Sequence, residues 1–177
     1  MVTSGYPWLP KSHCYNWIIK RKHPFEKITL EVNIMNKVVA FLNANPVQYL
    51  ATVGRDGKAK CRPFMFAGEL EGKLWFCTNN QKDVYKDMQA NPEIEISVSS
   101  PEYAWIRLHG KAVFENNMAA KEMCIRNPIV KGQYQTAANP IFEVFYLEGP
   151  TASSPTSPAI PPISSEICPR QVIERRG

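Results

Sequence analysis

The sequence predicts a mainly β domain with a few helices, arranged as a small closed or nearly closed antiparallel barrel of six or more strands. Short stretches that alternate apolar and polar residues recur through the middle of the chain, and glycine-bearing turns separate them. Only a few stretches with helical periodicity lie between these strands. Hydrophobic residues make up 44% of the 177 residues, which is enough to fill one core. An open sandwich is the alternative architecture for the same pattern.

The first predicted elements are a helix and a hairpin. Residues 35–43 place apolar side chains on one helical face, and the pattern stops at Asn45-Pro46. Strands follow at residues 47–53 and 60–66, and the Asp56-Gly57 dipeptide between them is a strong hairpin signal because both residues tolerate a positive φ.

The remaining elements alternate strands with short helices. A third strand at residues 73–78 is expected to form a hairpin with the second and to run directly into a helix. Strict alternation at residues 105–114 puts Ile106 and Leu108 on one face and Arg107 on the other. In chain order the later elements are a helix at 82–90, strands at 94–99 and 105–114, a helix at 117–126 and a strand at 142–147.

Composition divides the chain into three parts. Residues 1–34 are an N-terminal extension without a sustained period, residues 35–148 are the predicted domain, and residues 149–177 are rich in proline, serine and threonine. This last part is expected to be a disordered tail that forms neither helix nor strand.

Charge and cysteine content exclude several classes of protein. The net charge of +5 divides into +3, +1 and +1 over the three parts, so no concentrated basic face and no nucleic-acid partner are predicted. No apolar run reaches the roughly 18 residues of a membrane span, and no signal peptide is evident. The five cysteines form no C-x-x-C pair and lack histidines at metal-ligand spacing. We therefore expect a cytoplasmic protein without a metal site.

Polar residues at the end of the third strand could hold an anion. Thr78 and the two asparagines after it offer hydrogen-bond donors at the start of a helix, and Lys82 adds a positive charge. Arg62, on the preceding predicted strand, could add a forked guanidinium. A purely structural interpretation stays open: an asparagine caps the helix, and the two cations are solvated.

Four segments resemble the pyridoxamine 5′-phosphate oxidase-like family of FMN-binding split barrels. They are Tyr49-Leu50-Ala51-Thr52-Val53 with Asp56-Gly57, Arg62-Pro63-Phe64, residues 75–85 and residues 105–112. Their order and spacing are similar to the small single-domain members, which include the nitroimidazole-resistance type. The resemblance covers about residues 35–148.

This resemblance implies a split β-barrel that forms a homodimer with FMN at the subunit interface. Arg62 and Lys82 would then lie near the FMN phosphate, and Thr78 and Asn79 would bond to phosphate or ribityl. The other implied site residues are Pro63 and Phe64 along the isoalloxazine ring, Gln81 in the same loop, and Trp105 from the partner chain or at the ring edge.

The implied activity is an oxidoreductase that passes hydride or electrons between reduced flavin and a small acceptor, with the chemistry supplied by the flavin. No catalytic acid or base is identified. The arginine and histidine pattern of true pyridoxamine-phosphate oxidases is not evident, so vitamin B6 oxidation is not predicted. The alternatives are a non-catalytic flavin carrier or sensor, a split barrel that uses heme or a deazaflavin, and a cofactor-free barrel.

Both ends of the chain depart from the family pattern. Met35 resembles a natural start, and the Pro/Ser-rich stretch replaces an expected terminal strand. One hypothesis is a reading frame extended upstream and shifted near Glu148, which resequencing the gene would test. A missing last strand would expose one barrel edge.

Overall fold

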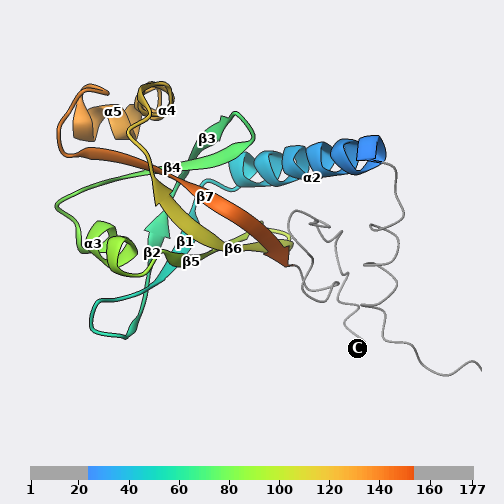
Figure 1. Cartoon of the computed structure of the whole chain (residues 1–177), viewed down its shortest axis with the longest axis horizontal. Coiled ribbons are helices and arrows are strands. Elements are labelled where there is room, and N and C mark those ends of the chain that lie inside the picture. The colour runs from blue at the N-terminus through green and yellow to red at the C-terminus, as the bar shows by residue number, and fades with distance from the viewer. Residues whose placement is uncertain (1–23, 154–177) are drawn as a thin grey trace, which may run out of the picture.

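A single seven-stranded antiparallel sheet dominates the computed structural model, which describes residues 24–153, with side chains from residue 34 onward. Four helices accompany the sheet in this part of the chain (Figure 1). The strands are β1 (Gln48–Val53), β2 (Ala59–Phe64), β3 (Phe66–Leu70), β4 (Lys73–Asn79), β5 (Glu93–Ser99), β6 (Trp105–Phe114) and β7 (Phe142–Ser153). The helices are α2 (Pro24–Ala44), α3 (Asp83–Ala90), α4 (Met118–Ile125) and α5 (Pro128–Tyr134).

The sheet curls because its two outermost strands are neighbours in the chain. The strand order is β2-β1-β5-β6-β7-β4-β3, so β2 and β3 lie at opposite edges. Only Met65 separates them in the sequence, and one residue spans less than 4 Å. The two edges must therefore meet at this point, which gives the partly closed barrel that the sequence predicts.

The main core fills the inside of this barrel. Fully buried side chains from five strands meet there, and Phe76 stacks on Phe145 with ring centroids 5.5 Å apart. Helix α2 covers the barrel with Val38, Phe41 and Leu42, all of which are buried. The amphipathic pattern predicted for residues 35–43 is thus the covering face of a longer helix.

A second, smaller core lies on the outer face of β4 and β7. Alternation along β4 sends Phe76 into the main core and Trp75 outward, and Trp75 is buried because α4 and α5 cover the outer face. Tyr134 of α5 stacks on Phe142 of β7, with ring centroids 4.4 Å apart. These two helices lie side by side at one end of the sheet (Figure 1).

The predicted second strand is divided in two. The continuous pattern at residues 60–66 ends as β2 at Phe64, and a separate strand, β3, pairs with β4. Arg62 therefore does not lie on a strand hairpin-linked to β4, and the hairpin partner of β4 is β3. No turn residue marks this break, because Met65 alone carries the chain between the edges.

The ends of the domain also differ from the prediction. Strand β7 continues through residues 149–153, which were expected to form no strand, and Ala152 is buried against the core. Gly149 adopts a positive φ of 57° opposite the register shift after His109, and this irregularity restores the pairing of Leu108 with Ala152. The helix predicted from residue 35 begins at Pro24, within the part expected to lack a pattern. The rest of the predicted extension and tail lies outside the described residues.

Candidate functional site

A cavity of about 400 Å³ opens where β2, β4, α3 and α5 come together. Small-molecule sites have volumes of roughly 300–1,000 Å³. Two cationic side chains, Arg62 and Lys82, line this cavity. Its remaining lining is largely apolar and comprises Pro46, Val47, Pro63, Phe64, Met65, Val84, Ile129 and Val130, together with Cys77, Gln133 and Tyr134. The cavity therefore suits a ligand with a large apolar body and a negatively charged end.

Arg62 reaches the cavity from the edge strand β2. It pairs across the sheet with Leu50, and its Nη1 donates to the Thr52 hydroxyl at 2.8 Å. Among the described residues Arg62 forms no salt bridge, so most of its donors remain available to an anion.

Lys82 is positioned by a turn that precedes helix α3. The Asn79 Oδ1 accepts the backbone N–H groups of Gln81 at 3.1 Å and Lys82 at 3.0 Å. Lys82 is the N-cap residue of α3 but makes no side-chain cap. Asn79 thus holds the turn before the helix, and the exposed ammonium group of Lys82 is free of salt bridges within the described part of the chain.

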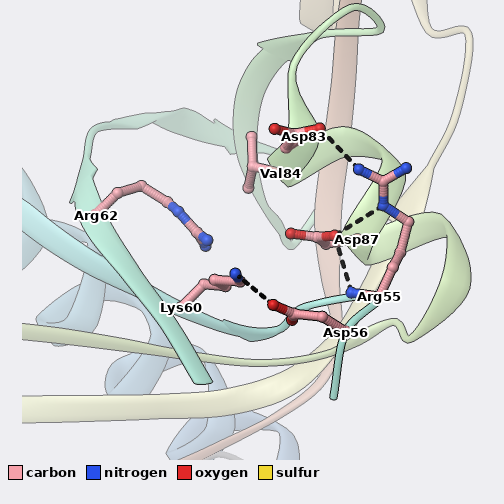
Figure 2. A pocket seen from close by; sticks show the side chains of 7 residues that line it. All are labelled: Arg55, Asp56, Lys60, Arg62, Asp83, Val84 and Asp87. Atoms are coloured by element: carbon pink, nitrogen blue, oxygen red, sulfur yellow. Dashed lines mark hydrogen bonds and ion pairs between the residues drawn. The ribbon is translucent and has the colours of Figure 1, made fainter. Parts of the chain in front are cut away.

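A second cavity of about 370 Å³ adjoins the first and shares Arg62 and Val84 with it (Figure 2). Its three cationic residues face three carboxylates: Arg55, Lys60 and Arg62 against Asp56, Asp83 and Asp87. The carboxylates lie on the β1–β2 turn and on α3, so this cavity as a whole carries no excess positive charge.

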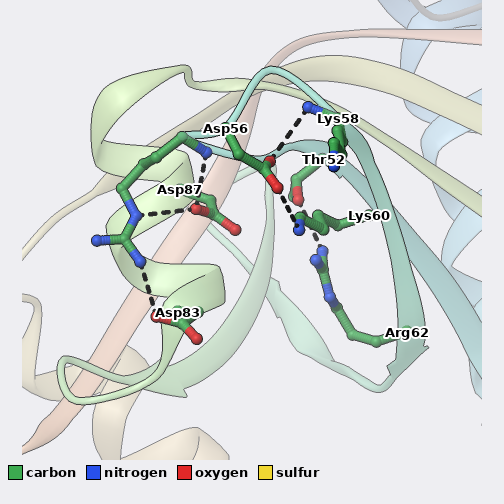
Figure 3. A network of polar contacts seen from close by, with 8 residues as sticks. Thr52, Asp56, Lys58, Lys60, Arg62, Asp83 and Asp87 are labelled. Atoms are coloured by element: carbon green, nitrogen blue, oxygen red, sulfur yellow. Dashed lines mark hydrogen bonds and ion pairs between the residues drawn. The ribbon is translucent and has the colours of Figure 1, made fainter.

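Most of the charged groups in the second cavity are paired with one another (Figure 3). Arg55 binds Asp83 at 2.7 Å and Asp87 at 3.1 Å, and Lys60 binds Asp56 at 2.9 Å. The backbone N–H of Arg55 also donates to Asp87, and this bond is the main reason why the pKa of Asp87 lies below its usual range. An anion should consequently bind more favourably beside Arg62 and Lys82 than among these paired groups.

Two cysteines meet beside the first cavity. Cys77 lines it from β4, and Cys124 of α4 belongs to the same outer core, near enough for each thiol to shift the pKa of the other. The neighbouring Cys124 thiol, together with the charge of Lys82, lowers the pKa of Cys77 despite its burial. The same contact and burial raise the pKa of Cys124.

The structure brings half of the predicted site residues to one cavity. Arg62, Pro63, Phe64 and Lys82 line it. Thr78, Asn79, Gln81 and Trp105 do not belong to its lining.

Three of these four residues are neighbours in the sequence of residues that line the cavity, but their own side chains point away from it or make other hydrogen bonds. Thr78 alternates with Cys77 and points to the inner face of the barrel. Its hydroxyl is buried without a hydrogen-bond partner among the described residues. Asn79 holds the turn, and the side chain of Gln81 is exposed.

Trp105 begins β6, three strands from Pro63 across the sheet. It is half-buried, and the Arg107 guanidinium lies 5.1 Å from the centre of its ring. Within one chain it cannot reach the cavity, so any role there would have to come from a second copy.

Sequence reasoning missed the wall that α5 contributes. Ile129, Val130 and Tyr134 all come from this helix, which was not predicted. A signal was present: the Asn127 side chain accepts the N–H of Ile129, and Pro128 occupies the first helical turn. Asparagine followed by proline is a common helix start.

Comparison with protein families decides the assignment of the chain. Residues 34–156 match the family model described as pyridoxamine 5′-phosphate oxidase. The chain belongs to this family. The match runs beyond Glu148, in agreement with the extended strand β7.

Solved structures with the same fold cover most of the chain. A NimC/NimA family protein from Clostridium acetobutylicum is 29% identical with a TM-score of 0.65, and the match covers 78% of this chain and 97% of that one. General stress protein 26 from Bacillus anthracis is 18% identical with a TM-score of 0.62, with 72% and 98% covered.

A heme-binding protein from Mycobacterium smegmatis is 16% identical with a TM-score of 0.53, with 72% and 56% covered. The last two similarities concern the fold alone. No curated protein matches the sequence. The small, single-domain branch predicted from the sequence agrees with the NimC/NimA neighbour.

No helix in the described part of the chain combines the length and the apolarity that a membrane span requires.

Proposed function

We propose that the chain binds FMN in the 400 Å³ cavity and acts as an oxidoreductase. The observation that carries this proposal is that Arg62 and Lys82, without salt bridges among the described residues, line the same largely apolar cavity. FMN combines a flat apolar ring system with a phosphate dianion, so both halves of the ligand find suitable surroundings.

The residues of the chain would have distinct tasks in holding FMN. Arg62 and Lys82 would bind the phosphate, and Pro63, Phe64 and Val84 would contact the ring system. Thr78, Asn79 and Gln81 would position the loop between β4 and α3, and the unpartnered Thr78 hydroxyl is a hydrogen-bonding group still to be satisfied. The bound flavin would supply the hydride or electron transfer to a small acceptor.

A homodimer would complete the site. Apolar residues are exposed on the outer face of β1 and beside it: Val47, Tyr49 and Val53. Val47 and Pro63 belong both to this face and to the cavity lining, so a second copy covering the face would also close the cavity. Trp105 lies on the same sheet face, two strands from β1, and the partner's copy of it could then approach the ring.

Three other proposals use the same cavity. A flavin carrier or sensor would bind FMN but transfer nothing to an added acceptor. A heme protein is less well supported, because the only histidine among the described residues is His109, an exposed residue 3.3 Å from Glu93 and outside the cavity. A deazaflavin would be distinguished from FMN by its absorbance spectrum.

The test is an FMN titration of the purified protein, followed by visible absorbance and flavin fluorescence. Replacing Arg62 and Lys82 together with alanine should weaken binding by about 2–4 kcal/mol, because each charge-assisted contact contributes roughly 1.5–3 kcal/mol and the exposed Lys82 contributes least. This corresponds to a roughly 30- to 1,000-fold higher Kd.

The matched control removes one arginine and one lysine that are exposed and line neither cavity, Arg126 and Lys86. This Arg126→Ala/Lys86→Ala variant should keep the affinity of the unmodified chain. Equal affinity of both double variants would refute the proposed phosphate site. Once FMN binds, anaerobic mixing of the reduced complex with a quinone or a nitroaromatic compound separates an enzyme from a carrier.

A further inference from the structure

Cys77 and Cys124 form a thiol pair that the proposed function does not use. Cys77 is on the outer face of β4, and Cys124 is in the last turn of α4, which covers that face. Both side chains belong to the small outer core, where β4 and α4 pack together, and each thiol shifts the pKa of the other. Cys61, by contrast, lies exposed on the edge strand β2, away from this core.

The two thiols differ in their access to solvent. Cys77 is half-buried and lines the open cavity, so a small reagent can reach its sulfur. Cys124 is 1% exposed and does not line the cavity. A nucleophilic thiol beside an open cavity, with a second thiol protected behind it, is the arrangement that an attacking and a resolving cysteine require.

Charge around the pair assigns the two roles. The neighbouring Cys124 thiol and the Lys82 ammonium both lower the pKa of Cys77 and so favour its thiolate, the form that reacts. Cys124 lies at a helix C-terminus, where the helix dipole disfavours a negative charge, and its burial acts in the same direction. The attacking group is therefore Cys77.

We propose that Cys77 and Cys124 are a peroxide-sensitive modification site that closes to a disulfide. The Cys77 thiolate attacks one oxygen of a hydroperoxide and breaks the O–O bond, which yields a sulfenic acid and, after protonation of the leaving oxygen, water or an alcohol. The Cys124 sulfur then attacks the sulfenic sulfur and displaces its hydroxyl group, which leaves with a proton as a second molecule of water. The peroxide is reduced by two electrons, and the two thiols are oxidised to one disulfide.

The first experiment uses the unmodified full-length chain. Purified reduced protein is treated with hydrogen peroxide, free thiols are blocked with N-ethylmaleimide, and the protein is digested and analysed by mass spectrometry without reduction. The expected product is a peptide pair joining Cys77 and Cys124, with the loss of two hydrogen atoms, in a chain that runs as a monomer on a denaturing non-reducing gel.

Variants then test the order of the two steps. In Cys124→Ser the sulfenic acid on Cys77 should persist and be captured by dimedone, whereas Cys77→Ser should give neither the disulfide nor the adduct at Cys124. Cys61→Ser is the control and should form the disulfide at the unmodified rate. Circular dichroism shows whether each variant is folded, and the peptide map of the unmodified chain decides the matter if one is not.

Other results would overturn the inference. These are a Cys77 that passes to sulfinic acid while Cys124 stays blocked by the maleimide, a disulfide of Cys77 with any other cysteine or with a second chain, and full reactivity of Cys124 in Cys77→Ser. Since the readout is protein mass in the absence of flavin, failure here leaves the proposed FMN site intact, and failure of FMN binding leaves the thiol pair intact.

Discussion

A charge placed at residue 152 tests the most consequential difference between the structure predicted from the sequence and the structure observed. The composition of residues 149–177 predicts a disordered tail, whereas Ala152 is 4% exposed and packs in the barrel core beside Leu108. In Ala152→Asp a carboxylate would enter this core without a partner. In Thr151→Asp the same charge would point outward, where Thr151 makes only a 3.4 Å exposed contact with the His109 carbonyl oxygen.

The size of the effect follows from the burial of the charge. An uncompensated charge in a protein interior costs about 3–5 kcal/mol. For the 130 residues from 24 to 153, each kcal/mol lowers Tm by about 3–4 °C, a value between those of smaller and larger domains. Ala152→Asp should therefore lower Tm by roughly 10–20 °C, and Thr151→Asp by less than about 2 °C.

The assay is thermal unfolding followed by circular dichroism, together with amide hydrogen exchange. If the end of β7 detaches instead of burying the charge, the fall in Tm is smaller, and the amides of residues 151–153 lose their protection. Equal Tm values for both variants and the unmodified chain, with equal exchange at these amides, would refute the pairing of this segment with β6.

Two further predictions concern backbone packing and pH. In Gly110→Ala the new Cβ would lie 2.6 Å from the carbonyl oxygen of Glu148, so we expect a loss of about 1–3 kcal/mol in denaturant unfolding. Gly132→Ala, in α5 with nothing within 4 Å, should instead gain about 0.5–1 kcal/mol, and a loss there would contradict the helix. The pKa of Asp87 is lowered in the folded state by Arg55, so the stability it contributes is present above its ordinary pKa and disappears as the pH falls through the folded value. Asp87→Asn should consequently be less stable at neutral pH and converge with the unmodified protein in acid, as measured by urea unfolding; a constant difference would contradict the ion pair.

Much of the barrel could be predicted from local sequence pattern. The alternation at residues 105–114 correctly placed Ile106 and Leu108 inside and Arg107 outside, because a strand with one buried face leaves a period of two in the sequence. The prediction failed where a strand boundary depends on which strands pair and leaves no mark in the local sequence pattern. Residues 60–66 were predicted as one strand, and only the pairing of β3 with β4 across the sheet reveals that a second strand begins at Phe66.

In the candidate site, too, some residues could be predicted from the sequence and others could not. Arg62 and Lys82 were predicted from residue type and resemblance, and the structure brings both to one cavity. Asn127-Pro128 signalled the start of α5, but the contact of this helix with the cavity could not be predicted, because it depends on tertiary packing. The thiol pair could not be predicted either, since Cys77 and Cys124 are distant in the sequence and meet only when α4 covers β4.

Met65, the single residue between β2 and β3, has a consequence for how the chain folds. The two rims of the barrel are adjacent along the chain, and each rim strand forms a local hairpin, β2 with β1 and β3 with β4. The pairings of β1 with β5 and of β4 with β7, in contrast, join strands that are distant in the sequence. Distant partners such as Trp75 and Tyr146 are paired in the sheet, so the fold has a high contact order and we expect it to form slowly. Lengthening this one-residue joint would let the two rims move apart while every strand pairing of the sheet stayed possible. At this point the chain connectivity sets the shape of the barrel.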